Sequence, residues 1–208
     1  MSRKGLLGCL VALALLAALA TGASAQAAGT RLCKTNVGTT CGAVYASGSK
    51  FVGTGAGSIS LPGVTACSNS TIEFEISAMG TGAESIEISL LTGTNCTGPC
   101  LVAGAGPVGA EVEASGTGPS GLATVAGSPG LVVGCNGGSF RCEYQPKPSA
   151  LPLIAGITGG TFATVKVSGV TMELLPGGSL GCPTETSLSM FQKVGPKTGT
   201  DGVYVKTV

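Results

Sequence analysis

The amino-acid sequence predicts an all-β fold, a single-domain β-sandwich or irregular barrel that is stapled by disulfides. Three observations lead to this prediction. Apolar and polar residues alternate with a period of two in several segments, which is the pattern of strands with one buried face. Clusters of glycine, serine and threonine separate these segments at short intervals, as in sandwiches and barrels. The chain also has nine cysteines and no histidine, which indicates a disulfide-rich extracellular domain rather than an enzyme.

The alternating segments define the predicted strands. Their apolar positions are Ile72, Phe74 and Ile76; Ile86, Ile88 and Leu90; Val108, Ala110 and Val112; Ala163, Val165 and Val167; Val170, Met172 and Leu174; and Val203 and Val205. The polar residues between them, Lys206 included, are predicted to face solvent. No segment after the leader has a 3.6-residue period of helical length, so we expect no long helix there.

Turn residues join some of these strands. Gly80–Ala83 is predicted to connect two strands of a hairpin, and Asn136-Gly137-Gly138 to connect a second pair. Gln145–Pro148 is predicted to be a stiff linker and not a strand, because its prolines cannot donate to a ladder.

The first 25 residues have the three parts of a secretory signal peptide. Two basic residues, an apolar run and a small-residue cleavage site follow one another: Arg3 and Lys4, Leu6 to Ala20, and Ala23-Ser24-Ala25. We expect cleavage before Gln26, which leaves residues 26–208 as a secreted, extracellular or cell-surface domain. We expect no membrane span after cleavage, because no second apolar run is long enough.

Eight cysteines remain after the leader and are all predicted to form disulfides: Cys33, Cys41, Cys67, Cys96, Cys100, Cys135, Cys142 and Cys182. Eight cysteines allow 105 pairings. Short spacing favours three local bridges, Cys33–Cys41, Cys96–Cys100 and Cys135–Cys142, which leaves Cys67–Cys182 as one long-range staple. The alternative is a zinc site, which is disfavoured because Cys96-x3-Cys100 has no second matched pair nearby and no histidine.

Several kinds of chemistry lack the residues that they need. Without histidine there is no Ser-His-Asp or Cys-His nucleophile, and a single aspartate, Asp201, excludes calcium loops built on several aspartates. Only 10% of residues are charged, and the balance is nearly neutral, so nothing attracts nucleic acid. Gly104-x-Gly106-x-x-Gly109 matches a dinucleotide fingerprint, but strand-like alternation follows it where a helix should begin. We therefore predict no catalytic residue, cofactor or metal.

Paired glutamates are the remaining catalytic candidates. Glu73/Glu75 and Glu111/Glu113 are i, i+2 pairs, and distant strands could bring Glu75 and Glu173 together, as a glycoside hydrolase requires. The simpler interpretation is that these carboxylates solvate the outer face of a half-buried sheet. The chain has no tryptophan and only three tyrosines, which gives a sugar few rings on which to stack.

Four short motifs carry a resemblance: Arg31-Leu32-Cys33, Val133-Gly134-Cys135…Cys142, Leu180-Gly181-Cys182-Pro183 and Gly202-Val203-Tyr204-Val205. In these the chain resembles a group of uncharacterised secreted, cysteine-containing all-β proteins of soil actinobacteria. The resemblance implies an all-β structure and export. It assigns no functional residues.

Three functions remain open at this point. The first is a secreted, non-enzymatic cell-envelope or extracellular protein that acts through structure or contacts with an unknown protein or cell-surface partner. The second is a binding or inhibitory module, such as a protease inhibitor, that presents a disulfide-clamped loop from Thr97 to Pro99. The third is a polysaccharide-active enzyme that uses paired glutamates. An exposed apolar patch would favour the first, a protruding clamped loop the second, and a cleft with two facing glutamates the third.

Overall fold

The computed structural model describes residues 29–59, 66–98, 100–104, 106–116, 118–177 and 180–208. The predicted signal peptide, residues 1–25, lies outside the described residues. The described chain is an all-β fold stapled by four disulfides, as the sequence predicts. Its strands are β1 (Thr30–Cys33), β2 (Asn36–Val37), β3 (Thr40–Cys41), β4 (Lys50–Ile59), β5 (Cys67–Met79), β6 (Glu84–Cys96), β7 (Cys100–Gly104), β8 (Val108–Ala114), β9 (Ser120–Val125), β10 (Leu131–Cys135), β11 (Phe140–Pro146), β12 (Leu153–Thr158), β13 (Ala163–Leu174), β14 (Glu185–Pro196) and β15 (Tyr204–Thr207), with single 3₁₀ turns η1 (Asn136–Gly138) and η2 (Pro148–Ala150).

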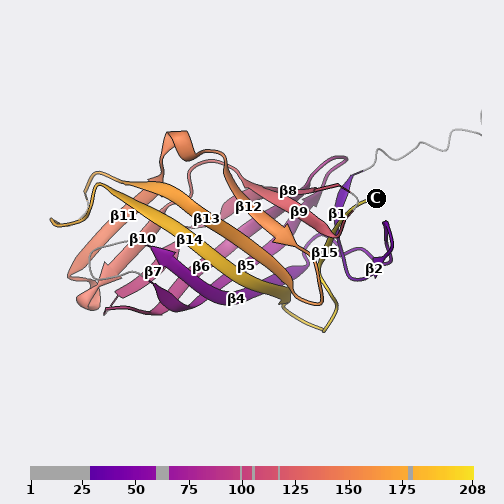
Figure 1. The fold of residues 1–208 in the computed structure, drawn as a ribbon, viewed down its shortest axis with the longest axis horizontal. Coiled ribbons are helices and arrows are strands. Elements are labelled where there is room, and N and C mark those ends of the chain that lie inside the picture. The colour runs from indigo at the N-terminus through magenta and orange to yellow at the C-terminus, as the bar shows by residue number, and fades with distance from the viewer. Residues whose placement is uncertain (1–28, 60–65, 99, 105, 117, 178–179) are drawn as a thin grey trace, which may run out of the picture.

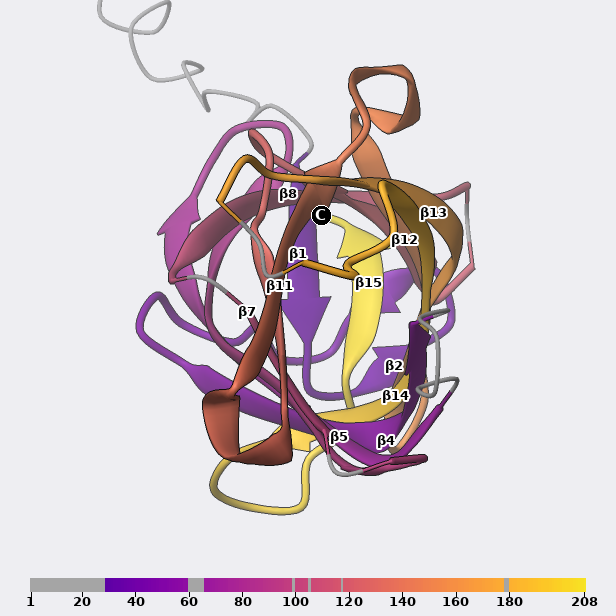
Figure 2. The same cartoon turned by 90° about the vertical axis from the view of Figure 1, so that its left-hand side faces the viewer.

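Eleven of these strands form one antiparallel sheet that closes on itself, so the fold is a barrel and not a sandwich (Figures 1 and 2). Five long strands lie side by side in the order β6, β5, β4, β14 and β13. At one end of the barrel β8, β9 and β12 close the gap between β6 and β13. At the other end β7, β10 and β11 close it. The barrel therefore has one shared wall and two different end walls.

A two-stranded ribbon of β1 and β15 lies inside one end of the barrel (Figure 2). Leu32 and Val205 of the ribbon, and Val203 just before β15, are at most 2% exposed. Lys206, predicted to face solvent, is also buried, and its Nζ donates to the carbonyl of Gly38 at 2.5 Å. The prediction for Lys206 is wrong because both faces of the ribbon are buried. Inferring exposure from a period of two assumes that one face of the strand is in contact with solvent.

The predicted strands and both hairpins are confirmed, with one change of phase. Gly80–Ala83 joins β5 to β6, and η1 joins β10 to β11. Ile72, Phe74, Ile76 and Ile86 are buried, but Leu90 is 39% exposed. The register between β5 and β6 shifts between Glu73 and Phe74, which places an extra residue in β6. Such a bulge reverses the alternation, so the next residue, Leu91, packs inside instead.

The prediction that Gln145–Pro148 is a linker is wrong for its first two residues. Gln145 and Pro146 end strand β11 and pair with β13. The N–H of Lys147 donates to the carbonyl of Thr171, and the carbonyl of Glu143 accepts from the N–H of Leu175, just after β13. Residues of this parity therefore face β13, and the nitrogen of Pro146, which has no hydrogen to donate, faces the β10 side. Strand β10 begins at Leu131, which pairs with Tyr144, so Pro146 lies beyond the end of β10. The proline therefore interrupts no hydrogen bond of the β10–β11 ladder.

All eight cysteines predicted to form disulfides do so, but three of the four predicted pairs are wrong. Cys33–Cys41 is confirmed. Cys96–Cys100, Cys135–Cys142 and Cys67–Cys182 are replaced by Cys67–Cys96, Cys100–Cys135 and Cys142–Cys182. The reason is strand register. Cys67 lies directly opposite Cys96, and Cys135 directly opposite Cys100, whereas Cys142 lies opposite Val133. Cys67–Cys96 and Cys100–Cys135 therefore tie neighbouring strands, Cys142–Cys182 ties β11 to the connection between β13 and β14, and the long loop expected between Cys67 and Cys182 is not closed.

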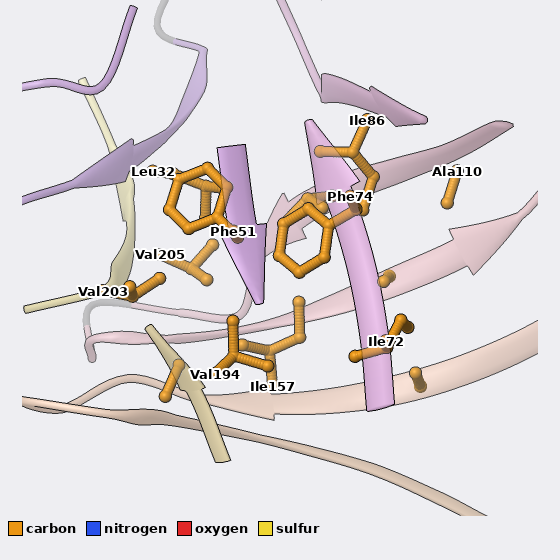
Figure 3. Close-up of a cluster of buried hydrophobic side chains, with 14 of the residues drawn as sticks. Leu32, Phe51, Ile72, Phe74, Ile86, Ala110, Ile157, Val194, Val203 and Val205 are labelled. Atoms are coloured by element: carbon orange, nitrogen blue, oxygen red, sulfur yellow. The ribbon is translucent and has the colours of Figure 1, made fainter. Parts of the chain in front are cut away.

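The interior is filled by two clusters of apolar side chains. The larger lies in the half closed by β8, β9 and β12 and includes the ribbon, and the smaller lies in the half closed by β7, β10 and β11. Phe51 is central to the larger cluster. Its ring stacks on Phe74 with centroids 5.0 Å apart and meets the edge of Tyr45 at 4.9 Å. Figure 3 shows Phe51 and Phe74 with other side chains of this cluster, which converge from strands far apart in sequence.

Candidate binding cavity

A cavity of about 110 Å³ lies inside the barrel, where the two halves meet. Ile72 and Phe74 line it from the shared wall, and Val125 and Leu131 line it from the two end walls. The residues around it belong to both apolar clusters. The cavity thus lies between the two apolar clusters, at the level where the end wall of β8, β9 and β12 is replaced by that of β7, β10 and β11.

The lining of this cavity offers no hydrogen-bond partners from side chains. Every described lining residue is aliphatic, phenylalanine, methionine, glycine or proline. A buried water needs two to four polar partners, so this space does not suit water. A second cavity of about 30 Å³ shares Leu91, Leu131 and Leu188 with the first and lies next to it on the β7 side.

One side of the cavity lies behind a gap in strand pairing. Strand β6 pairs with β8 as far as Ile88 and with β7 from Thr92 onward. Gly106 and the pair Pro129–Gly130, from the connections that follow β7 and β9, line the cavity at this gap. Gly106 is at the same time exposed to solvent. Of the described residues, two glycines and a proline therefore separate the cavity from the outside at this point.

A buried carboxylate, Glu84, holds the ribbon to the barrel wall. In the β1–β15 pair, Gly29 exchanges hydrogen bonds with Val208, so the N–H of Leu32 points away from β15. That N–H donates to Oε2 of Glu84, which is 0% exposed. Its other oxygen, Oε1, has no hydrogen-bond partner. Glu84 thus accepts a hydrogen bond from the edge of β1 that faces away from β15, but one of its own two carboxyl oxygens has no hydrogen-bond partner.

Burial raises the pKa of Glu84 from 4.5 to about 7. Desolvation of the charged form is the main cause, and it outweighs the hydrogen bond from Leu32 and the positive charge of Arg31, which both act to lower the pKa. Glu84 is not among the residues that the sequence patterns predict to be functional. The signal was present, because Glu84 has the same parity in β6 as Ile86 and Ile88, which face inward.

A second buried polar pair lies in the shared wall. Gln192 on β14 is 0% exposed, and its Nε2 donates to the hydroxyl of Ser70 on β5. Its Oε1 has no hydrogen-bond partner. This amide is neutral at all relevant pH values, so it offers no acid–base chemistry.

The glutamates proposed as a catalytic pair stay on the outside of the barrel. Glu73 and Glu75 form ion pairs with Lys197 at 2.8 Å and Lys50 at 3.6 Å. Glu111 and Glu113 are exposed, and Glu173 accepts a hydrogen bond from Gln145 at 2.8 Å. Strands β5 and β13, which carry Glu75 and Glu173, are separated by β4 and β14. The structure does not bring the two carboxylates to one cleft.

The loop proposed as an inhibitory clamp is not closed by its own bridge. Cys96 and Cys100 flank it, but each is bonded to a cysteine on a neighbouring strand. Thr97 is tied to Ala66 by a backbone hydrogen bond of 2.8 Å, and Pro99 lies outside the described residues. The glycine pattern Gly104-x-Gly106-x-x-Gly109 leads into strand β8 and not into a helix, so it does not form a dinucleotide site.

An apolar patch lies on the outer face of β9 and β12. Leu122 and Ile154 are 45% and 48% exposed. The register places Leu122 opposite Gly156 and Ile154 opposite Thr124, so the two side chains are diagonal neighbours on one face. Glu113 lies opposite Leu122 on one side of this β9–β12 patch, and Lys166 lies opposite Gly156 on the other.

Comparison of the chain with protein-family models, with curated proteins and with solved structures finds no match. Among the described residues, no group of three or more cysteine, aspartate or glutamate side chains is placed to hold a metal ion. The eight cysteines from Cys33 to Cys182 are oxidised, so they are not thiolate ligands for zinc. Within the same residues, no helix has the length and apolar character needed to cross a membrane.

Proposed function

We propose that this protein is a secreted, non-enzymatic protein of the extracellular space or cell envelope that acts through contacts of its outer wall with a protein or cell-surface partner. The observation that carries the proposal is the β9–β12 patch. Two large aliphatic side chains lie together, nearly half exposed, on a regular sheet surface. Exposed aliphatic residues that adjoin one another, with charged residues at the rim, are typical of contact surfaces.

The four disulfides support an extracellular location. Cys67–Cys96 and Cys100–Cys135 connect neighbouring strands of the barrel, Cys142–Cys182 ties β11 to the connection between β13 and β14, and Cys33–Cys41 closes the β2–β3 loop. Such bridges persist in oxidising compartments. A crosslinked wall presents its surface residues with little conformational freedom, which lowers the entropic cost of binding a partner.

The proposal is tested by capture from the surface of the native culture. The oxidised protein is immobilised, a reversible crosslinker is added, and bound proteins are identified and quantified by mass spectrometry. The double variant Leu122→Ser/Ile154→Ser should reduce recovery of the partner at least tenfold. Leu101→Ser is the matched control, because Leu101 is 61% exposed on β7 at the other end of the barrel. Equal recovery with both variants, or no specific partner, would contradict the proposal.

A further inference from the structure

We propose that the cavity inside the barrel is a binding site for a small, neutral hydrocarbon group, either a free molecule or the tail of a larger amphiphile. This inference does not depend on the contact function proposed for the outer wall. It rests on the chemistry of the cavity, on its size and on its access.

The chemistry of the lining selects an uncharged apolar guest. No described side chain around the cavity carries a donor or acceptor. A charged or strongly hydrogen-bonding group would lose its hydration there and gain nothing in return. A hydrocarbon would instead regain the dispersion contacts that the lining atoms lack while the space is empty.

The size of the cavity limits the guest to about one ring or a short chain. An engineered apolar cavity of about 150 Å³ stays dry and binds benzene or xenon. The present cavity of about 110 Å³ is somewhat smaller, and a separate cavity of about 30 Å³ adjoins it across Leu91 and Leu131. The guest is therefore no larger than benzene or a short alkyl chain.

Small residues keep the space open from one side. Ala123 on β9 and Ala155 on β12 both line the cavity, and they are direct partners across the two strands. Each is at most 6% exposed and faces the interior. A larger aliphatic residue at either position would project into the cavity, so these two alanines are the positions at which the site can be filled.

The gap in strand pairing gives the guest a route of entry. Gly106 lines the cavity and is exposed, and it has a φ of +98°. Among the described residues, nothing lies within 4 Å of the point where a side chain at Gly106 would begin. A tail could therefore occupy the cavity while its polar end stays in solvent, which is why both free molecules and tails belong to the proposed class.

The experiment measures binding to the oxidised protein by two sets of probes. Benzene and xenon represent free guests, and hexanol and hexanoate represent tails. Binding is followed by NMR, through chemical-shift changes and intermolecular NOEs to the methyl groups of Ile72 and Leu131. Ala155→Leu fills the cavity, Ala123→Val fills part of it, and Ala56→Leu adds the same bulk to an exposed position on β4.

Binding of at least one set to the wild type, with NOEs to Ile72 and Leu131, is expected. Ala155→Leu should weaken it at least tenfold, Ala123→Val severalfold, and Ala56→Leu not at all. If Ala155→Leu does not fold, the proposal is tested by the NOEs to Ile72 and Leu131 in the wild type and by the loss of affinity in Ala123→Val. Binding of hexanol and hexanoate alone identifies a tail site, and binding of benzene or xenon identifies a site for free guests. The proposal is overturned if no probe binds, or if binding persists unchanged when the cavity is filled.

Discussion

Replacing Glu84 by glutamine should remove a pH dependence of stability that the wild-type protein shows between about pH 4.5 and pH 7. The pKa of the buried carboxyl group rises from 4.5 to about 7 on folding. Between these values the unfolded chain has released its proton while the folded protein still holds it. Stability therefore falls as the pH rises through this window.

The magnitude follows from the pKa difference. At about 1.4 kcal/mol for each pKa unit, Glu84 makes the folded protein about 3 kcal/mol less stable at pH 8 than at pH 4, relative to a neutral side chain. The contribution is fully favourable below pH 4.5, where both states are protonated, and is lost above pH 7. Ion-paired carboxylates on the surface act in the opposite direction, so the difference between wild type and variant is the quantity to measure.

Urea unfolding of the oxidised protein, followed by far-UV circular dichroism at pH 4, 5, 6, 7 and 8, gives this difference. Glutamine keeps an oxygen for the N–H of Leu32 and removes the charge, although its amide hydrogens are left without a known acceptor. The stability of Glu84→Gln relative to wild type should rise by about 3 kcal/mol from pH 4 to pH 8. Glu111→Gln, on the exposed face of β8, controls for the loss of one negative charge. A wild-type-to-variant difference that stays constant with pH would refute the burial argument.

Three further predictions concern the crosslinks, the packing around Phe51 and catalysis. Replacing Cys142 and Cys182 by alanine opens a loop of 40 residues and should lower the free energy of unfolding by about 4 kcal/mol, whereas replacing Cys33 and Cys41, with a separation of 8, should lower it by about 2.5 kcal/mol. Urea unfolding measures both losses, and equal losses would contradict the loop-entropy argument. Peptide mapping checks the disulfide pairs directly. Phe51→Ala should lower the free energy of unfolding by about 3–5 kcal/mol, because the ring is fully buried between two other rings. Phe191→Ala is the control, because Phe191 is 46% exposed and its replacement should change stability by about 0.5 kcal/mol or less. Similar losses for the two variants would contradict this prediction. A broad panel of glycan and peptide substrates should show no turnover, and turnover that is abolished by Glu75→Gln or Glu173→Gln would show that the protein is an enzyme.

The candidate sites were only partly visible in the sequence. The alternation in β5 predicted which residues face inward, but the cavity depends on where the end walls change over, and no local pattern records that. Glu84 carried a signal in its parity with Ile86 and Ile88. No pattern in the sequence indicated its role, because Glu84 accepts its hydrogen bond from the N–H of Leu32, 52 residues earlier in the chain. The β9–β12 patch likewise arises only when Leu122 and Ile154 meet across two strands.

The sequence alone determined the class of fold, about half of the described strands (β5, β6, β8, β10, β11, β13 and β15), two hairpins and the set of cysteines that form disulfides. Each of these follows from interactions between residues close together in the chain: side-chain alternation, turn residues and the even number of thiols. The tertiary structure decided the closure into a barrel, the bridge partners, the reversal of phase at Leu90 and the burial of Glu84 and Lys206. These depend on strand register over long separations, and a shift of one residue exchanges the inside and the outside of a strand.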